Sequence, residues 1–126
     1  MKGVLVDTSV WVDHFRRQNN ALTDLLELDL VMAHPLVVGE IACGTPPHRI
    51  QTLTDLGSLQ QAQLASVREV MDFIERERLF GASCGLIDLM LLASTLITPG
   101  TELWTLDKRL SGLADRFGVM HRSTLH

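Results

Sequence analysis

Short apolar segments alternate with longer segments of helical periodicity along the whole chain, and this alternation limits the possible folds more than any other sequence feature. Buried strands are predicted at residues 3–7, 30–33 and 103–105, and two further segments, 59–64 and 119–120, are compatible with strands. Strands separated by helices favour an α/β sandwich with a mainly parallel sheet. In such sheets the functional crevice lies at the carboxyl ends of the strands.

Helices are predicted at residues 10–17, from residue 19 or 20 onward, and at 35–43, 48–56, 66–79, 86–97 and 107–117. Thr8 or Ser9 can cap the first of these helices. Pro35 suits the first turn of the third helix, and Gly44 suits its end. Residues 86–97 are apolar nearly all round, which predicts a central position for that helix.

The length of 126 residues is that of one domain, so residues 1–126 are expected to fold as a single unit. Hydrophobic residues make up 46% of the chain, which is enough for a substantial core. No apolar run reaches the roughly 18 residues that a membrane-spanning helix needs. The first residues lack the pattern of a signal peptide, and we therefore expect a cytoplasmic protein.

The net charge of −4 does not by itself indicate a nucleic-acid-binding protein. Nine of the eleven basic residues are arginines, however, and several occur in pairs. Arginine suits bidentate contact with phosphate better than lysine does. The charge pattern therefore permits nucleic-acid binding without establishing it.

The cysteines, histidines and tryptophans are expected to have structural rather than catalytic roles. Cys43 and Cys84 form no Cys-x-x-Cys motif and are expected to be reduced thiols in the core. The five histidines lie outside the acidic segments, so surface or turn positions are expected for them. Trp11 and Trp104 are expected to pack beside the sheet rather than to stack on a base.

Four acidic residues lie inside or directly after apolar segments, where a carboxylate is costly to desolvate. They are Asp7, Glu40, Asp88 and Asp107. Asp107 is followed by Lys108, but the other three have no basic residue close by in the sequence. Asp7 and Asp107 each have a second interpretation as a helix cap, whereas Glu40 and Asp88 do not.

These four carboxylates are best explained if they meet and share cations. Oxygen ligands with few histidines or cysteines suit Mg²⁺ or Mn²⁺. A carboxylate cluster that binds one or two such ions is typical of enzymes that hydrolyse phosphodiesters.

Four segments carry a resemblance to the PIN-domain family, particularly to its VapC toxins. The segment Val6-Asp7-Thr8-Ser9-Val10-Trp11 resembles the first PIN motif, and Trp104-Thr105-Leu106-Asp107-Lys108-Arg109-Leu110 resembles the fourth. Residues 38–41, around Glu40, and residues 87–93, around Asp88, are similar to the second and third motifs. The order and separation of the motifs fit across nearly the whole chain.

The resemblance implies a metal site formed by all four acids. It also implies a hydroxyl near the metal, which maps to Ser9 in preference to Thr8, with Thr105 supporting the loop. Some relatives carry a further acid after the fourth one. Lys108 follows Asp107 here, so no fifth ligand is expected.

At the level of the whole protein, the resemblance implies a three-layer α/β/α sandwich around a mainly parallel central sheet. It further implies a Mg²⁺-dependent ribonuclease, with Mn²⁺ able to substitute, that acts as the toxin of a toxin–antitoxin pair. The implied partners are an RNA substrate, a cognate antitoxin protein and a second copy of the chain in a homodimer.

Other functions compete with this interpretation. A phosphatase that forms an aspartyl phosphate usually has a second acid two residues after its nucleophile, whereas position 9 is Ser. A receiver-like signalling domain would have adjacent acids near its first strand end, which are absent. A PIN-like module that only binds RNA or protein is disfavoured because all four acids are present.

Overall fold

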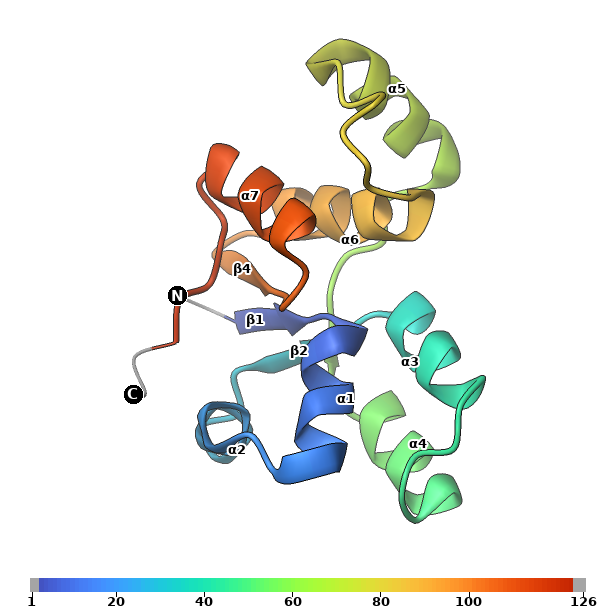
Figure 1. The fold of residues 1–126 in the computed structure, drawn as a ribbon, viewed down its shortest axis with the longest axis vertical. Coiled ribbons are helices and arrows are strands. Elements are labelled where there is room, and N and C mark those ends of the chain that lie inside the picture. Colours follow the sequence, from blue (N-terminus) through green and yellow to red (C-terminus); the bar gives the residue numbers. More distant parts are fainter. Residues whose placement is uncertain (1–2, 124–126) are drawn as a thin grey trace.

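The computed structural model describes residues 3–123, which form a four-stranded sheet covered by helices (Figure 1). The strands are β1 (Gly3–Val6), β2 (Val31–Ala33), β3 (Gln60–Gln61) and β4 (Thr101–Trp104). Their order in the sheet is β3-β2-β1-β4, and every pairing is parallel. The predicted parallel α/β fold is therefore confirmed.

Strand β1 is central because its side chains can be buried on both faces of the sheet. All four of its residues are buried, as expected for a parallel strand with helices on either side. The register places Val4 opposite Val31 on one side and Val6 opposite Trp104 on the other.

The two weakly predicted strands lie at the edges of the sheet and are short. Segment 59–64 contributes only the two exposed residues of β3. Segment 119–120 contributes an isolated parallel bridge between Met120 and Leu103 rather than a strand.

The helices that connect the strands are α1 (Thr8–Arg17), α2 (Asn20–Glu27), α3 (Pro35–Ala42), α4 (Arg49–Gly57), α5 (Val67–Glu77), α6 (Leu86–Ile97) and α7 (Lys108–Arg116). Helices α1 to α4 lie on one side of the strands and α5 to α7 on the other (Figure 1). This division is the one that right-handed crossovers produce, because the chain moves outward from β1 to β3 and then returns to β4.

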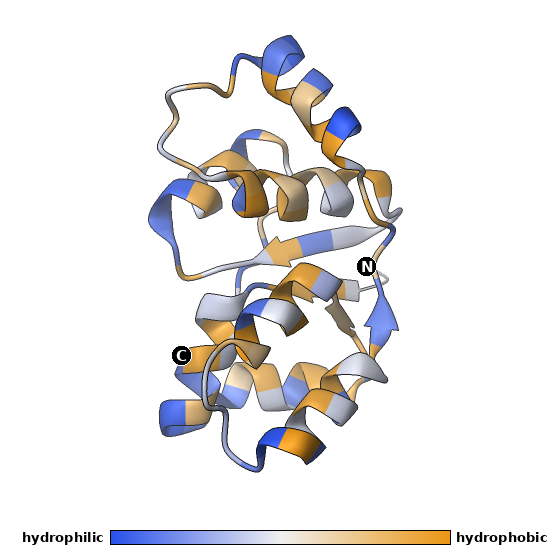
Figure 2. Ribbon diagram, turned by 90° about the vertical axis from the view of Figure 1, so that its right-hand side faces the viewer, coloured by the Kyte–Doolittle hydropathy of each residue, from blue (hydrophilic) through white to orange (hydrophobic). Residues whose placement is uncertain are grey.

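The core forms where helix faces meet the sheet. Figure 2 shows α5 alternating between hydrophilic and hydrophobic residues, whereas α6 is hydrophobic along most of its length. Leu91 and Leu92 in the middle of α6 are fully buried, which agrees with the predicted central position. Trp11 and Trp104 are buried as well, so both pack in the core as predicted.

Three local predictions were wrong. Cys43 is exposed, because it lies at the carboxyl end of α3 rather than within the helix. His34 is buried, since its ring caps α3 and contacts Ser94 of α6. Helix α1 begins at Thr8, so Asp7 takes the capping position, and its side chain makes no capping hydrogen bond.

In the part of the chain that the structure describes, no helix is both long and apolar enough to cross a membrane.

Candidate active site

The carboxyl ends of β1 and β4 lie side by side at the point where the chain leaves the sheet in two directions. After β1 the chain enters α1 on one side of the sheet, and after β4 it enters α7 on the other (Figure 1). The Asp7 N–H donates to the Trp104 carbonyl at 2.9 Å, which extends the pairing past the strand ends. Ligand sites of open α/β sheets occur at such switch points.

Asp7 is a desolvated carboxylate held by two hydroxyls. Its side chain is only 6% exposed, and its Oδ2 accepts hydrogen bonds from Thr105 Oγ1 at 2.7 Å and Ser9 Oγ at 2.9 Å. The Ser9 oxygen also accepts from the Leu106 N–H at 3.0 Å. Ser9 thus joins the start of α1 to the loop after β4 and does not cap a helix.

Asp107 lies at the start of α7, where its Oδ1 accepts from the N–H groups of Arg109 at 2.8 Å and Leu110 at 3.2 Å. Its own N–H donates to Thr105 Oγ1 at 3.1 Å. The side chain of Thr105 therefore connects Asp7 to the backbone of Asp107.

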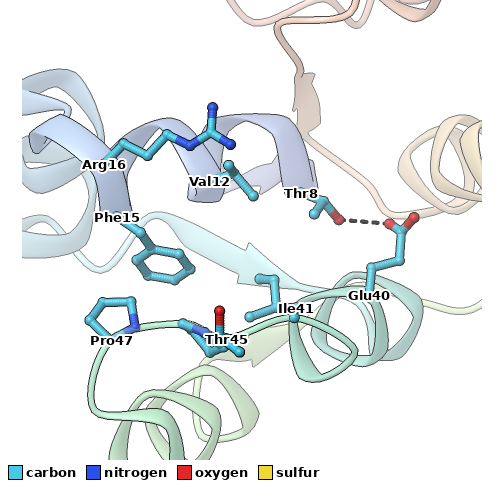
Figure 3. Close-up of a pocket in the computed structure, with 10 residues that line it drawn as sticks. Thr8, Val12, Phe15, Arg16, Glu40, Ile41, Thr45 and Pro47 are labelled. Atoms are coloured by element: carbon cyan, nitrogen blue, oxygen red, sulfur yellow. Dashed lines mark hydrogen bonds between the residues drawn. The ribbon is translucent and has the colours of Figure 1, made fainter.

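Glu40 reaches the site from α3. Its Oε1 accepts a hydrogen bond from Thr8 Oγ1 at 2.7 Å, and the side chain is otherwise open to solvent (Figure 3). Thr8, the less favoured hydroxyl in the sequence, therefore orients an acid. No local pattern in the sequence links positions 8 and 40.

Asp88 lies in the first turn of α6 and is partly buried. Burial raises the pKa of its carboxyl above the ordinary value, while a hydrogen bond from the Gly85 backbone opposes the rise. The negative charges of Asp7, Asp107 and Glu40 raise this pKa further. All three acids therefore lie within electrostatic reach of Asp88.

The thiol of Cys84 lies near the same acids. Burial raises its pKa, and the charges of Asp88 and Asp107 add to the rise, while Arg109 opposes it. Cys84 is partly buried, so the expectation of a core thiol holds better for Cys84 than for Cys43.

The donor set suits a hard divalent cation. Asp7, Glu40 and Asp107 each engage one carboxylate oxygen in hydrogen bonds and leave the other without a hydrogen-bond partner within residues 3–123. Carboxylate oxygens of this kind are the ligands that Mg²⁺ and Mn²⁺ prefer. Their mutual repulsion supplies a reason to bind positive charge.

No three acidic, histidine or cysteine side chains among the described residues already converge on one point as metal ligands. Glu40 is exposed and bonded only to Thr8, so its side chain can rotate toward a cation, whereas Asp107 is exposed but held by its two capping bonds. Asp7 is fixed by its two hydroxyl partners and sets the position toward which Glu40 would move.

Comparison with known proteins shows the family of this chain. The PIN domain family model matches residues 4–116, and the chain belongs to the PIN domain family. Two curated relatives are both named Ribonuclease VapC32, from Mycobacterium tuberculosis strains CDC 1551 / Oshkosh and ATCC 25618 / H37Rv. Each is 40% identical to this chain over 116 residues, which cover 92% of this chain and 94% of the relative.

Proposed function

We propose that this protein is a metal-dependent endoribonuclease and the toxin of a toxin–antitoxin pair. The observation that supports the proposal most is the position of Asp7 and Asp107 at the switch point of a PIN fold, where both bond to the Thr105 hydroxyl. The charges of Asp7, Asp107 and Glu40 all act on Asp88, which supports a role for all four acids. The name of the M. tuberculosis relatives supports RNA as the substrate. An RNA substrate in turn supports a cytoplasmic location.

The four acids would hold the metal, which we propose to be Mg²⁺, with Mn²⁺ able to substitute. When bound, a divalent ion makes water more acidic and neutralises the negative charge that develops on the phosphate. Asp7 supplies the fixed ligand because Thr105 and Ser9 hold its carboxylate. Asp107 would supply a second positioned ligand, since the N–H groups of Arg109 and Leu110 hold its Oδ1, and Glu40 would supply an adjustable one.

Basic side chains beside the acids would receive the RNA phosphates. Lys108 and Arg109 follow Asp107 and are both exposed. The charge of Arg109 also acts on Cys84, which lies near Asp88, so this guanidinium is close to the site. A cation at this point offsets the repulsion between the acids and an approaching phosphate.

The site would also explain an antitoxin partner. A cluster of carboxylates attracts a basic side chain, and an antitoxin that inserts an arginine or lysine there would displace the metal. Co-purification with the product of the neighbouring gene would support this partner. Free RNA cleavage in the protein's own cells without toxicity would contradict it.

A homodimer is supported by apolar side chains that remain exposed on the outer side of the sandwich. Val67 and Met71 of α5 are 49% and 55% exposed, and Leu96 and Ile97 of the adjacent α6 are 37% and 40% exposed. Burial of such side chains in a second copy would be favourable. Sedimentation velocity that showed a monomer at all concentrations would contradict this proposal.

The test is cleavage of single-stranded RNA by wild type and by Asp7→Asn, Asp88→Asn and Asp107→Asn. Each substitution removes one charge with little change in volume, so cleavage should fall by about 10²-fold or more while circular dichroism stays unchanged. Asp72→Asn is the matched control, since Asp72 lies exposed on α5 with only a long ion pair to Arg68. Full activity in folded Asp88→Asn would exclude the proposed site.

A further inference from the structure

A pocket of about 390 Å³ opens beside the acidic site, between α1 and the loop that follows α3 (Figure 3). This volume lies within the range of roughly 300–1,000 Å³ that is usual for small-ligand sites. One end of the pocket is the hydrogen-bonded pair of Thr8 and Glu40. The pocket therefore adjoins Glu40, although most of its lining residues lie outside the acidic motifs.

One wall of the pocket is a single face of α1. Thr8, Val12, Phe15 and Arg16 recur at the spacing that places side chains on one side of a helix. Phe15 points from α1 toward Pro47 of the opposite wall (Figure 3). Its ring stacks on the buried ring of Trp11, with centroids 6.1 Å apart and an interplanar angle of 29°. The ring of Phe15 therefore rests on the core on one side and lines the pocket on the other.

The opposite wall is held in shape by its own hydrogen bonds. Arg49 donates to the Ala42 carbonyl at 2.6 Å, and the Thr52 hydroxyl donates to the Pro47 carbonyl at 2.5 Å. The first bond joins α4 to the end of α3, and the second fastens the loop to α4. The Thr45 side chain lines the same space and can offer a hydroxyl to a polar ligand (Figure 3).

Among the described residues, Arg16 is the only basic one that lines the pocket. Its guanidinium extends along α1 toward the end where Thr8 and Glu40 lie (Figure 3). The side chain is exposed and makes no ion pair with a carboxylate in residues 3–123. Its neighbour Arg17 differs, because it forms a 2.6 Å ion pair with Asp13.

We infer that this pocket binds one unpaired base of the RNA next to the cleaved phosphodiester, with Arg16 on an adjacent phosphate. An aromatic ring, an apolar wall and one free cation at the edge are the combination that binds single-stranded nucleic acid. The site adjoins Glu40, so a base in the pocket would set which phosphodiester reaches the acids. The inference rests on the proposed ribonuclease function and assigns it a specificity determinant.

The first experiment measures how Phe15 and a single base of the substrate depend on each other. A single-stranded RNA that wild type cleaves at one bond is remade with an abasic residue at each flanking position in turn. For wild type, one position should raise KM roughly tenfold, since stacking of one base is lost. Phe15→Ala and the milder Phe15→Leu should raise KM on the intact RNA. For these variants, an abasic residue at that position should raise KM much less than it does for wild type.

The second experiment tests whether Arg16 contacts a phosphate, by measuring how the affinity for RNA depends on the salt concentration. Affinity for fluorescein-labelled RNA is followed by anisotropy in an Asp107→Asn background, so that the RNA is not cleaved. Arg16→Gln should reduce the slope of log Kd against log salt by about 0.7, the value for one phosphate contact on a single strand. Arg17→Gln is the matched control, because it removes the same charge from the next residue.

If the abasic residue raised KM by the same factor in Phe15→Ala as in wild type, Phe15 would not contact that base. This result would overturn the base pocket. Equal slope changes for Arg16→Gln and Arg17→Gln would overturn the phosphate contact. Variants that keep RNA affinity but lose a co-expressed protein inhibitor would show that a protein occupies the pocket, which also overturns the inference. If wild type cleaves no RNA, the nuclease proposal fails, while the binding data still decide the pocket.

Discussion

At the scale of single residues, the site depends on hydroxyls as much as on acids. Asp7 would be costly to bury alone, because a carboxylate loses its hydration inside the protein. Thr105 and Ser9 replace part of that hydration with short hydrogen bonds. These contacts join residues 98 and 2 positions apart, and the first fastens the loop after β4 to the residue that follows β1.

We predict that Thr105→Val destabilises the protein by about 1–3 kcal/mol and also lowers cleavage. The substitution keeps the side-chain shape but leaves the Asp7 carboxylate and the Asp107 N–H each without one partner. Urea denaturation and initial cleavage rates would measure both effects. Ser9→Ala should cost less, since Ser9 is only partly buried. Thr54→Val, which removes an exposed hydroxyl on α4, is the control and should change neither quantity.

At the scale of elements, the sequence predicted correctly those helices and strands whose formation depends on their own residues. Strand β1 and helix α6 were predicted because their apolar composition requires burial whatever they pack against. The meeting of Asp7 and Asp107 also followed from the sequence, since parallel strands place their carboxyl ends together. The Thr8–Glu40 contact and the buried ring of His34 did not follow, because each depends on how two helices pack.

We predict that Asp107→Asn and Asp107→Ala will differ in stability but not in activity. Asparagine caps a helix about as well as aspartate, whereas alanine loses the bonds to Arg109 and Leu110. Both variants should lose most cleavage, but only Asp107→Ala should lose about 1 kcal/mol of folding free energy. Thermal melts beside cleavage assays separate the two roles. Equal stability of the two variants would remove the capping role.

We predict that His34 makes the fold less stable in mild acid. Its Nδ1 accepts from the Leu36 N–H and its Nε2 contacts Ser94, and burial lowers its pKa below the ordinary 6.5. The unfolded chain therefore binds a proton that the folded one does not. This contribution to stability is complete above about pH 6.5 and falls as the pH drops toward the folded pKa.

The measurement for His34 is urea denaturation of wild type and His34→Asn between about pH 7 and pH 5. Asparagine can keep the cap on α3 but does not titrate, so the variant should lose part of the pH dependence. His48→Asn is the control, because His48 is exposed. If the free energy of unfolding of His34→Asn depended on pH as that of wild type does, burial of His34 would not affect its ionisation.

At the scale of the whole molecule, metal binding and folding should be linked. Four carboxylates repel one another in the metal-free protein, and a cation that binds only the folded state stabilises it. The gain is about 2.7 kcal/mol at a concentration one hundred times Kd. We therefore predict a higher melting temperature in millimolar Mn²⁺ than in chelator.

The matched variant for this effect is Asp88→Asn. It relieves repulsion from Asp7, Asp107 and Glu40, so its metal-free form should be at least as stable as wild type. Its gain from Mn²⁺ should be smaller. A purely structural acid would show the reverse pattern, with a less stable metal-free protein and an unchanged response to metal. If the melting temperature of wild type were the same in Mn²⁺ and in chelator, a tight metal site would be excluded.

The pairing of the first strand with the fourth also has a consequence for synthesis on the ribosome. Asp7 is translated 100 residues before Asp107. At roughly 5–20 residues per second, the delay is on the order of ten seconds. An unfinished chain lacks half of the acid-bearing crevice, so it should be harmless to the RNA around it. The proposed antitoxin would then be needed only from the time when Asp107 has been translated and has joined Asp7.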